Sequence, residues 1–390
     1  MKEMLLVLFC AVGYQSVAQV GIGTDDPKAG LHVVDRRVVF SAAGDVTASD
    51  RLPLSKANRR LMWYPEQAAF RVGMVNSYGA TYWDVVNIGN YSFSAGENTR
   101  ASGDYSVAMN LATTASGNGA VALGNNGAAT ADRAFGFNGT ASAVGTVAIG
   151  SGAQATGSDA MAWGPSSLVG GAASIAIGPS ITNGSFAVTI GLQNGASGHY
   201  SVAIGKNART AGKYGSMVLG DGSAGFSSDS VYATADNQLS TRGAAGIRLL
   251  TSSELSSGVE LSAGGGAWNV ISDRRKKENF QAIGATEAES VLQKVAAIPI
   301  FRWNYKSQPT TQQHIGPMAQ DFHAAFQLDG IANDTTINTV DIDGINMVTI
   351  QALERRTIAL RLGVDNLTDE LAEMDRRLAV LEAWMAKNKQ

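Results

Sequence analysis

A serine and two lysines lie close together in the sequence, at Ser272, Lys276 and Lys277. A seryl hydroxyl becomes a nucleophile when a neutral amine accepts its proton, and a lysine removed from water can supply that amine without any histidine. Lys276 lies one helical turn from Ser272, so spacing alone does not choose between the two lysines. A Ser-Asp pair ahead of a basic run is more often a helix cap or a solvated turn, and spacing alone favours that interpretation.

The chain changes character at this serine. From Ser272 to Gln390, less than a third of the 390 residues, the sequence holds 30 of its 63 charged residues. The sequence before Ser272 is instead rich in Gly, Ala and Ser. A change in composition this sharp predicts a domain boundary.

The pattern Ser272-Asp273-x-Arg275-x-Lys277 resembles the signature of the intramolecular chaperone domain that ends phage endosialidases and tail fibres, a family of serine–lysine self-cleaving peptidases. Phe280 stands where the family usually has Ile. Two later blocks, VLQKVAAIPIFRWNY from residue 291 and HIGPMAQDFHAAF from residue 314, are similar to further parts of that family. The resemblance covers about residues 270–390.

This resemblance implies that the region assists the assembly of a homotrimer and then cuts the bond between Ile271 and Ser272. It also implies that Ser272 is the nucleophile and Lys277 the base. Asp273 and Arg275 are expected in supporting roles, and either Arg275 or a backbone N–H would donate to the oxyanion.

The N-terminus has the features of an export signal. Lys2 precedes an apolar run from Leu5 to Val12, and the small residues Ser16-Val17-Ala18 follow. We expect residues 1–18 to be a signal peptide and the mature chain to be secreted or held at the cell surface. No apolar run is long enough to predict a membrane span. Cys10, the only cysteine, lies inside this signal, so no disulfide is expected in the mature chain.

The rest of the sequence offers little further chemistry. A formal net charge of −3 does not favour a nucleic-acid partner. None of the glycine-rich runs has the GxxxxGK[ST] or strand–GxGxxG–helix context of a nucleotide site. The segment Asp341-x-Asp343-Gly344 lacks the remaining ligands of a calcium loop and is predicted to be a turn. We therefore expect no cofactor and no metal site.

A short motif repeats through residues 91–224. Its copies end at a Gly or Asn every 12 to 15 residues, most often 14, as SFSAG, SVAMN, AVALG, AFGFN, TVAIG, AMAWG, SIAIG, AVTIG, SVAIG and SMVLG. Residues two apart, such as Val202 and Ile204, share one face of a strand, with a small residue between them. The Gly or Asn suits a corner with positive φ. Such coils must stack to bury their apolar face, which predicts a β-roll or solenoid shaft.

The second face of each predicted strand carries Ala or Ser, and we expect it to let neighbouring chains approach closely. The pattern S-x-A-I-G…A-x-G is similar to the head repeats of trimeric autotransporter adhesins, which implies a homotrimer of β-rolls. A monomeric solenoid and a disordered low-complexity tract are the alternatives. The regular Val, Ile and Leu argue against disorder.

Two other β-rich regions flank the repeats. Residues 19–90 alternate apolar residues with Gly and Pro, and residues 225–269 contain the segments GIRLL, GVEL and AWNV. The first region predicts a compact head and the second a neck, both made of short strands. The head holds an aromatic cluster, more often core than binding site: Trp63, Tyr64, Phe70, Tyr82 and Trp83.

The C-terminal residues 350–390 predict a coiled coil, because apolar residues alternate steps of three and four over five heptads. The predicted seam is Ile350, Leu353, Thr357, Leu360, Val364, Leu367, Leu371, Met374, Leu378, Leu381 and Met385. Leu and Met do not fix the number of strands, so a trimer rests on the resemblance.

The expected fold is therefore mainly β: a trimeric β-roll or solenoid shaft, a small α+β chaperone domain at 270–349 and a terminal coiled coil. The expected function is that of an exported surface fibre or adhesin that binds a glycan or a host or matrix protein. One alternative is a phage-type receptor-binding tail fibre, against which the signal peptide argues. Another is a secreted glycan-acting enzyme, for which residues 106–220 offer only six charged residues.

Overall fold

The computed structural model describes residues 19–35, 58–223, 225, 227–328 and 334–388. The predicted signal peptide lies outside these residues. The chain divides into two compact units, Met1–Ala244 and Ala245–Gln390, and each is described by itself. None of the helices in the described ranges combines the length and apolar character that a bilayer crossing requires.

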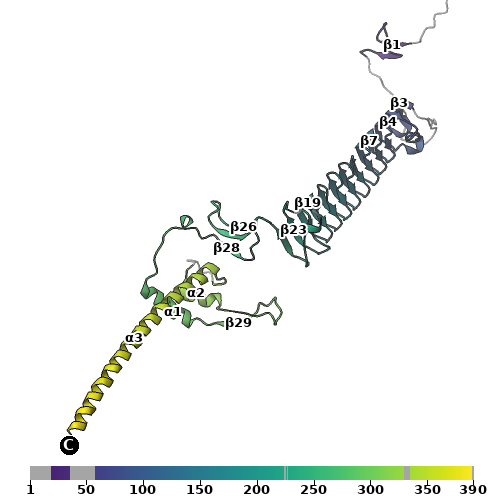
Figure 1. Cartoon of the computed structure of the whole chain (residues 1–390). Helices are drawn as coiled ribbons and strands as arrows, with labels where there is room; N and C mark the ends of the chain where they lie inside the picture. Colours follow the sequence, from purple (N-terminus) through teal and green to yellow (C-terminus); the bar gives the residue numbers. More distant parts are fainter. Residues whose placement is uncertain (1–18, 36–57, 224, 226, 329–333, 389–390) are drawn as a thin grey trace, which may run out of the picture. The chain divides into compact units, whose positions relative to one another are not determined.

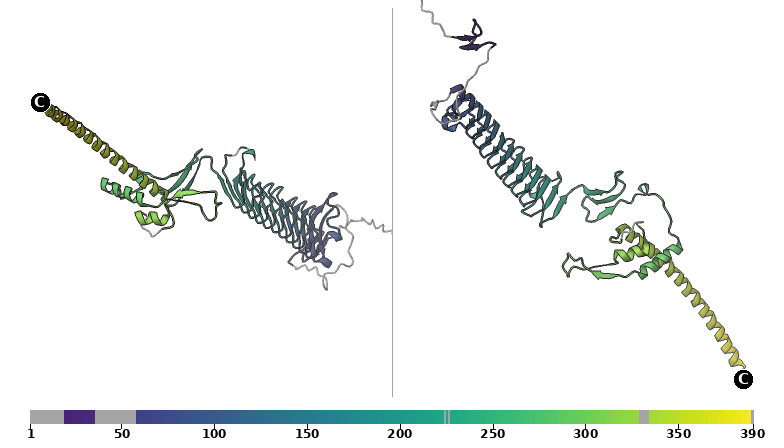
Figure 2. Two further views of the ribbon diagram at one scale, coloured as in Figure 1. Left: turned by 90° about the horizontal axis from the view of Figure 1, so that it is seen from below. Right: turned by 180° about the vertical axis from the view of Figure 1, so that it is seen from behind.

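The first unit contains a β-solenoid whose coils stack in a row (Figures 1 and 2). A typical coil gives one strand to a 13-stranded sheet and a shorter strand to a 10-stranded sheet. The larger sheet contains β3 (Asn58–Tyr64), β4 (Ala69–Val75), β5 (Phe93–Glu97), β7 (Val107–Leu111), β9 (Val121–Asn125), β11 (Phe135–Phe137), β13 (Val147–Ile149), β15 (Met161–Trp163), β17 (Ile175–Ile177), β19 (Val188–Leu192), β21 (Val202–Lys206), β23 (Met217–Gly220) and β25 (Leu239–Arg242). The smaller sheet contains β6 (Arg100–Ala101), β8 (Thr114–Ala115), β10 (Ala128–Ala129), β12 (Thr140–Ala141), β14 (Gln154–Ala155), β16 (Leu168–Val169), β18 (Ile181–Thr182), β20 (Gly195–Ala196), β22 (Ala208–Arg209) and β24 (Val231–Tyr232). The predicted solenoid is confirmed.

Small side chains fill the interior of the solenoid. Ala108, Ala122 and Ala203 are the second residues of β7, β9 and β21 and are fully buried. The larger residues on either side of each alanine project from the opposite face of the sheet, and Ile177 and Ile190 are each 39% exposed. The prediction that the Ala and Ser face contacts neighbouring chains is therefore wrong. The two sheets of a coil enclose a narrow core whose largest buried side chains include Val169 and Val218. The larger apolar residues therefore point outward.

The corners of the coils depend on positive φ, as predicted. Gly205, which ends the copy SVAIG, has a φ of 103°, and Asn138 has a φ of 53°. A Cβ added at Gly205 would lie 1.8 Å from the carbonyl oxygen of Gly220 in the next coil. The close stacking of coils therefore excludes a side chain at this corner.

The N-terminal end of the solenoid is closed by part of the predicted head. β4 pairs in parallel with β5, and β3 pairs antiparallel with β4, so both extend the larger sheet. The short helices η1 (Pro65–Gln67) and η2 (Val85–Asn87) lie in the same region. A separate pair of parallel strands, β1 (Val20–Ile22) and β2 (Leu31–Val33), precedes it.

Arg71 is fully buried in this cap. Its guanidinium donates to the Ser92 carbonyl oxygen at 3.0 Å, the Ser92 hydroxyl at 2.8 Å and the Ala101 carbonyl oxygen at 2.8 Å. Burial lowers the pKa of Arg71 to about 10, so it remains protonated at neutral pH. The indole N–H of Trp83, also fully buried, donates to the Thr99 carbonyl oxygen at 2.8 Å. The Trp83 bond satisfies a carbonyl group that the end of the solenoid would otherwise leave unpaired. The Ser92 and Ala101 carbonyl oxygens also accept from the N–H groups of Phe70 and Gly89, so Arg71 adds a second donor to each and ties the two segments together.

Replacing Arg71 with Met should loosen the first coils, because the buried hydrogen bonds that join Arg71 to Ser92 and Ala101 are lost. We expect a loss of about 2–4 kcal/mol of stability, and faster hydrogen exchange in β4 and β5 than in β19 and β21. The control is Arg133→Asn, which changes an exposed arginine at a corner with a φ of 57°. Equal exchange rates in the Arg71 variant and the unaltered chain would contradict the capping role.

The solenoid continues beyond the predicted end at residue 224. β24 and β25 pair with β22 and β23, and the short helix η3 (Ser227–Asp229) precedes them. Arg242 Nε lies 2.8 Å from Asp221 Oδ1 and fastens this last coil. Hydrogen bonds from the Ala244 N–H, the Ser223 hydroxyl and Arg242 hold the pKa of Asp221 well below its usual range.

The second unit is mixed α and β. It contains an antiparallel sheet of β26 (Gly246–Leu250), β27 (Gly258–Ser262) and β28 (Trp268–Val270), then a hairpin of β29 (Phe301–Trp303) and β30 (His314–Gly316). The helices are η4 (Arg274–Lys276), α1 (Ala285–Ala297), α2 (Ala319–Phe326) and α3 (Thr339–Lys387). α1 packs on the first part of α3 through Ala288, Leu292, Val348 and Ala352 (Figure 1).

Helix α3 begins eleven residues before the predicted coiled coil at residue 350. The predicted turn at 341–344 is therefore wrong, since these residues are helical. The side chain of Asn338 caps the helix by accepting from the Val340 N–H at 3.0 Å. The predicted seam is exposed in the single chain; Leu353 is 45% and Leu367 66% exposed. The coiled coil itself stays a prediction.

Candidate active site

Ser272 lies between a strand and a turn. It follows β28 by one residue, and the N–H of that residue, Ile271, donates to the Gly258 carbonyl oxygen at 3.1 Å. Asp273 then caps η4, because its Oδ1 accepts from the Arg275 N–H at 2.9 Å. The bond between Ile271 and Ser272 is thus held from both sides.

The structure brings the predicted nucleophile and the predicted base together. Lys277 Nζ donates to Ser272 Oγ at 2.8 Å. The turn η4 makes this approach possible, because it brings the chain back on itself between the two residues. Both residues are exposed in the single chain. An amine at this distance can exchange a proton with the hydroxyl once it is neutral.

The other charged residues of the segment have different partners. Lys276 Nζ donates to the Leu255 carbonyl oxygen at 2.8 Å, in the segment that joins β26 to β27. Arg275 Nη2 lies 2.7 Å from Asp273 Oδ2. This pair lowers the pKa of the Asp273 carboxyl and raises the pKa of Arg275. Arg275 therefore donates to Asp273 here, which leaves a backbone N–H as the other predicted donor to an oxyanion.

A hollow of about 330 Å³ lies beside the Ile271–Ser272 bond. It is lined by Arg248, Glu260, Asn269, Val270, Ile271, Ser272, Asp273 and Lys276. Arg248 and Glu260 are direct cross-strand partners, with Nε and Oε2 3.9 Å apart. Sequence reasoning missed these two residues, because opposite charges in two predicted strands do not reveal the register that pairs them.

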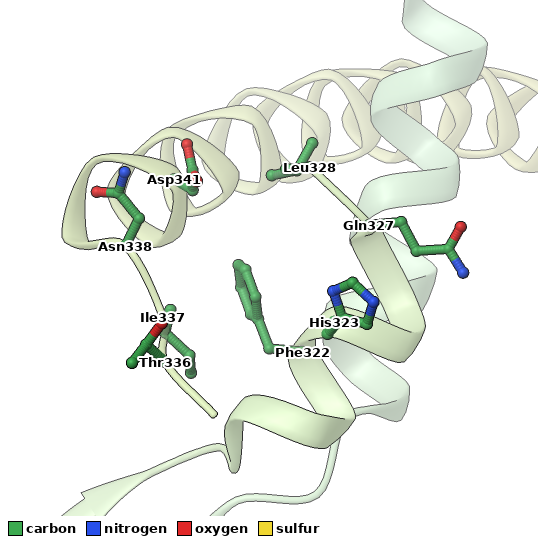
Figure 3. A pocket seen from close by; sticks show the side chains of 8 residues that line it. All are labelled: Phe322, His323, Gln327, Leu328, Thr336, Ile337, Asn338 and Asp341. Carbon is green, nitrogen blue, oxygen red and sulfur yellow. The ribbon is translucent and has the colours of Figure 1, made fainter. Parts of the chain in front are cut away.

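A second hollow, of about 300 Å³, lies where α2 meets the start of α3. Figure 3 shows Phe322 pointing into it, with His323 on α2 and Asp341 on α3 at its sides. An aromatic ring inside a small hollow fits packing better than substrate binding, so we assign no chemistry to it.

Two family models match the chain, one in each of its two compact units. Residues 272–330 match the family model described as the chaperone of endosialidase. The match begins at Ser272. The YadA head domain repeat matches at residues 88–109, 141–167, 155–180, 184–208 and 196–223. Both resemblances seen in the sequence are confirmed by these matches. The search of curated proteins gives no significant match to the chain.

Proposed function

We propose that the chain is the subunit of an exported homotrimeric surface fibre of the adhesin type. Its C-terminal region would assemble three chains and then detach itself by cutting between Ile271 and Ser272. The support is the combination of an adhesin-type solenoid with a region similar to the chaperone of endosialidase. Both kinds of domain are typical of proteins outside the cell.

The proposal of a trimer is supported by a continuous column of large apolar residues on the outer face of the larger sheet, which we call the apolar column. The column contains Met109, Leu123, Phe137, Ile149, Trp163, Ile177, Ile190, Ile204 and Leu219. Trp163 is 54% exposed in the single chain. An apolar surface of this length is typical of an interface. Three chains that face one another would remove it from water.

The chaperone role rests on the exposed seam of α3. Coils of similar sequence can pair one coil out of register at small cost, because each presents the same strand to its neighbours. A trimeric coiled coil would hold the other two chains near the correct alignment and raise their effective concentration. Cleavage would then separate the fibre from the element that aligned it, so the fibre would be held kinetically.

The mature chain from Gln19 should have the mass of three chains in light scattering at micromolar concentration. Ile190→Lys places a charge in the apolar column and should prevent assembly. Gln154→Lys places the same charge on the outer face of the smaller sheet and should leave the mass unchanged. A folded monomer of the unaltered chain would contradict the trimer.

A further inference from the structure

One coil of the solenoid is two residues shorter than its neighbour. The register pairs Phe135 with Val121 and Ala141 with Ala129, so the two segments between these residues are equivalent. The segment that begins at Val121 has nine residues, whereas the segment that begins at Phe135 has seven. The two missing positions therefore lie in the corner between β11 and β12. They are the positions that Gly124 and Asn125 occupy in the preceding coil.

The side chain of Asn138 replaces part of the missing backbone. Its Oδ1 accepts from the Asn125 N–H at 2.5 Å, and a Cβ added at Gly124 would lie 2.1 Å from the same oxygen. The amide does not fill the space of two residues. A hollow of about 520 Å³ remains, which we call the corner notch. It is lined by Asn125, Asn126, Asn138, Gly139, Thr140, Ser151 and Gly152.

The corner notch is polar and uncharged. None of its seven lining residues is ionisable; they offer three amides and two hydroxyls. The side chains of Asn125 and Asn126 are exposed and make no hydrogen bond within the described part of the chain. Without a cation the notch does not favour an anion, and without a carboxylate it does not favour a metal. Amides that donate and accept at once suit a ligand made of neutral hydroxyl groups.

We propose that the corner notch binds a neutral oligosaccharide. Its volume lies in the usual range for small-ligand sites, about 300–1,000 Å³. This inference adds a ligand class to the proposed function. It rests on that function only for the number of notches in one fibre. A trimer would present three notches at the same height, so weak single-site binding would gain from avidity on a glycan-coated surface.

The sharpest test fills the notch. Inserting Gly-Asn between Phe137 and Asn138 gives the corner GNNG that the preceding coil already uses. On an array that pairs neutral oligosaccharides with their sialylated and sulfated forms, the mature chain should retain neutral ones. The insertion should weaken this binding about tenfold or more, the equivalent of at least one lost hydrogen bond. Asn126→Gly should weaken it too, without strain, because Asn126 has a φ of 56°.

Two matched controls apply. Gln193→Gly changes the equivalent corner position, with a φ of 58°, in a coil without the notch. Inserting a serine after Ser180 lengthens another short corner, where eight residues run from Ile175 to Thr182. Neither should alter binding.

The proposal is overturned if the mature chain retains no neutral oligosaccharide, or if the Gly-Asn insertion binds as well as the unaltered chain. It is also overturned if the insertion blocks trimer formation, since the notch would then hold a side chain of a second copy. Light scattering separates this proposal from the proposed function. A trimer without glycan binding removes only the notch, and a monomer with glycan binding removes only the trimer.

Discussion

A mature chain that carries Ser272→Ala should run as one full-length band, whereas the unaltered chain should give two. The fragments should be Gln19–Ile271 and a piece whose first residue is Ser272. The reason is that the alanine variant lacks the hydroxyl that lies 2.8 Å from Lys277 Nζ. Without this nucleophile the peptide bond is stable, and the chain should remain trimeric, because the seam of α3 is untouched.

The chemistry we propose for this cut is an N-to-O acyl transfer. Ser272 Oγ attacks the carbonyl carbon of Ile271 while Lys277 accepts the hydroxyl proton. The carbon–nitrogen bond then breaks, the proton passes to the Ser272 nitrogen, and an ester joins Ile271 to Oγ. Water hydrolyses the ester, which leaves a carboxylate on Ile271 and restores the Ser272 hydroxyl. The net change is the addition of one water.

The two adjacent lysines provide matched controls for one another. Lys277→Ala should slow cleavage by about 100-fold or more, the usual contribution of a positioned base. Lys276→Ala should still cut, because Lys276 Nζ contacts the Leu255 carbonyl oxygen instead of Ser272. N-terminal sequencing of the smaller fragment fixes the bond that breaks. If Ser272→Ala were cleaved normally, the catalytic assignment would be wrong and this segment would be a capped, solvated turn.

Removing the chain from Ala352 onward should leave the solenoid insoluble or aggregated. The truncation deletes the predicted seam after Ile350 and also the contact of Ala352 with α1. Chains without this alignment would expose the apolar column and the edges of their sheets to one another. The measurement is the soluble fraction after expression, followed by limited proteolysis.

A shorter deletion tests whether the loss of any C-terminal residues is enough to prevent assembly. A chain that ends at Leu378 keeps most of the seam and should still assemble into a protease-resistant trimer. If the chain that ends before Ala352 also gave soluble, resistant trimers, α3 would have no role in assembly.

The repeat was readable from the sequence because its period and its corner residues are both local signals. The spacing of the copies predicted the strands, and the alternation of Val202 and Ile204 around Ala203 predicted two faces for each strand. Gly205 predicted the corner that follows. Which face lies inside was not readable. That depends on how closely the second sheet approaches, and Ala203 is buried because the gap is narrow. Hydrophobicity alone would have placed the larger residues in the core.

The candidate site was predictable in part. A resemblance selected Ser272 and Lys277, whereas spacing left both lysines open. Lys276 and Leu255 are 21 residues apart in the sequence, and no local pattern predicts their contact. The same holds for Arg71, whose carbonyl partner on Ala101 lies 30 residues away. Contacts of this kind follow from how the coils and strands stack.

The orientation of the coils also sets how the shaft responds to a mechanical load. Strands run across the stack, so a coil of 14 residues adds about 4.8 Å to its length. The same residues pulled straight span about 46–50 Å. Tension on the ends would therefore peel off one coil at a time, and each peeled coil would span roughly ten times the length that it adds to the folded shaft. Peeling must begin at an end, where the buried Arg71 and the pair of Asp221 with Arg242 hold the outermost coils.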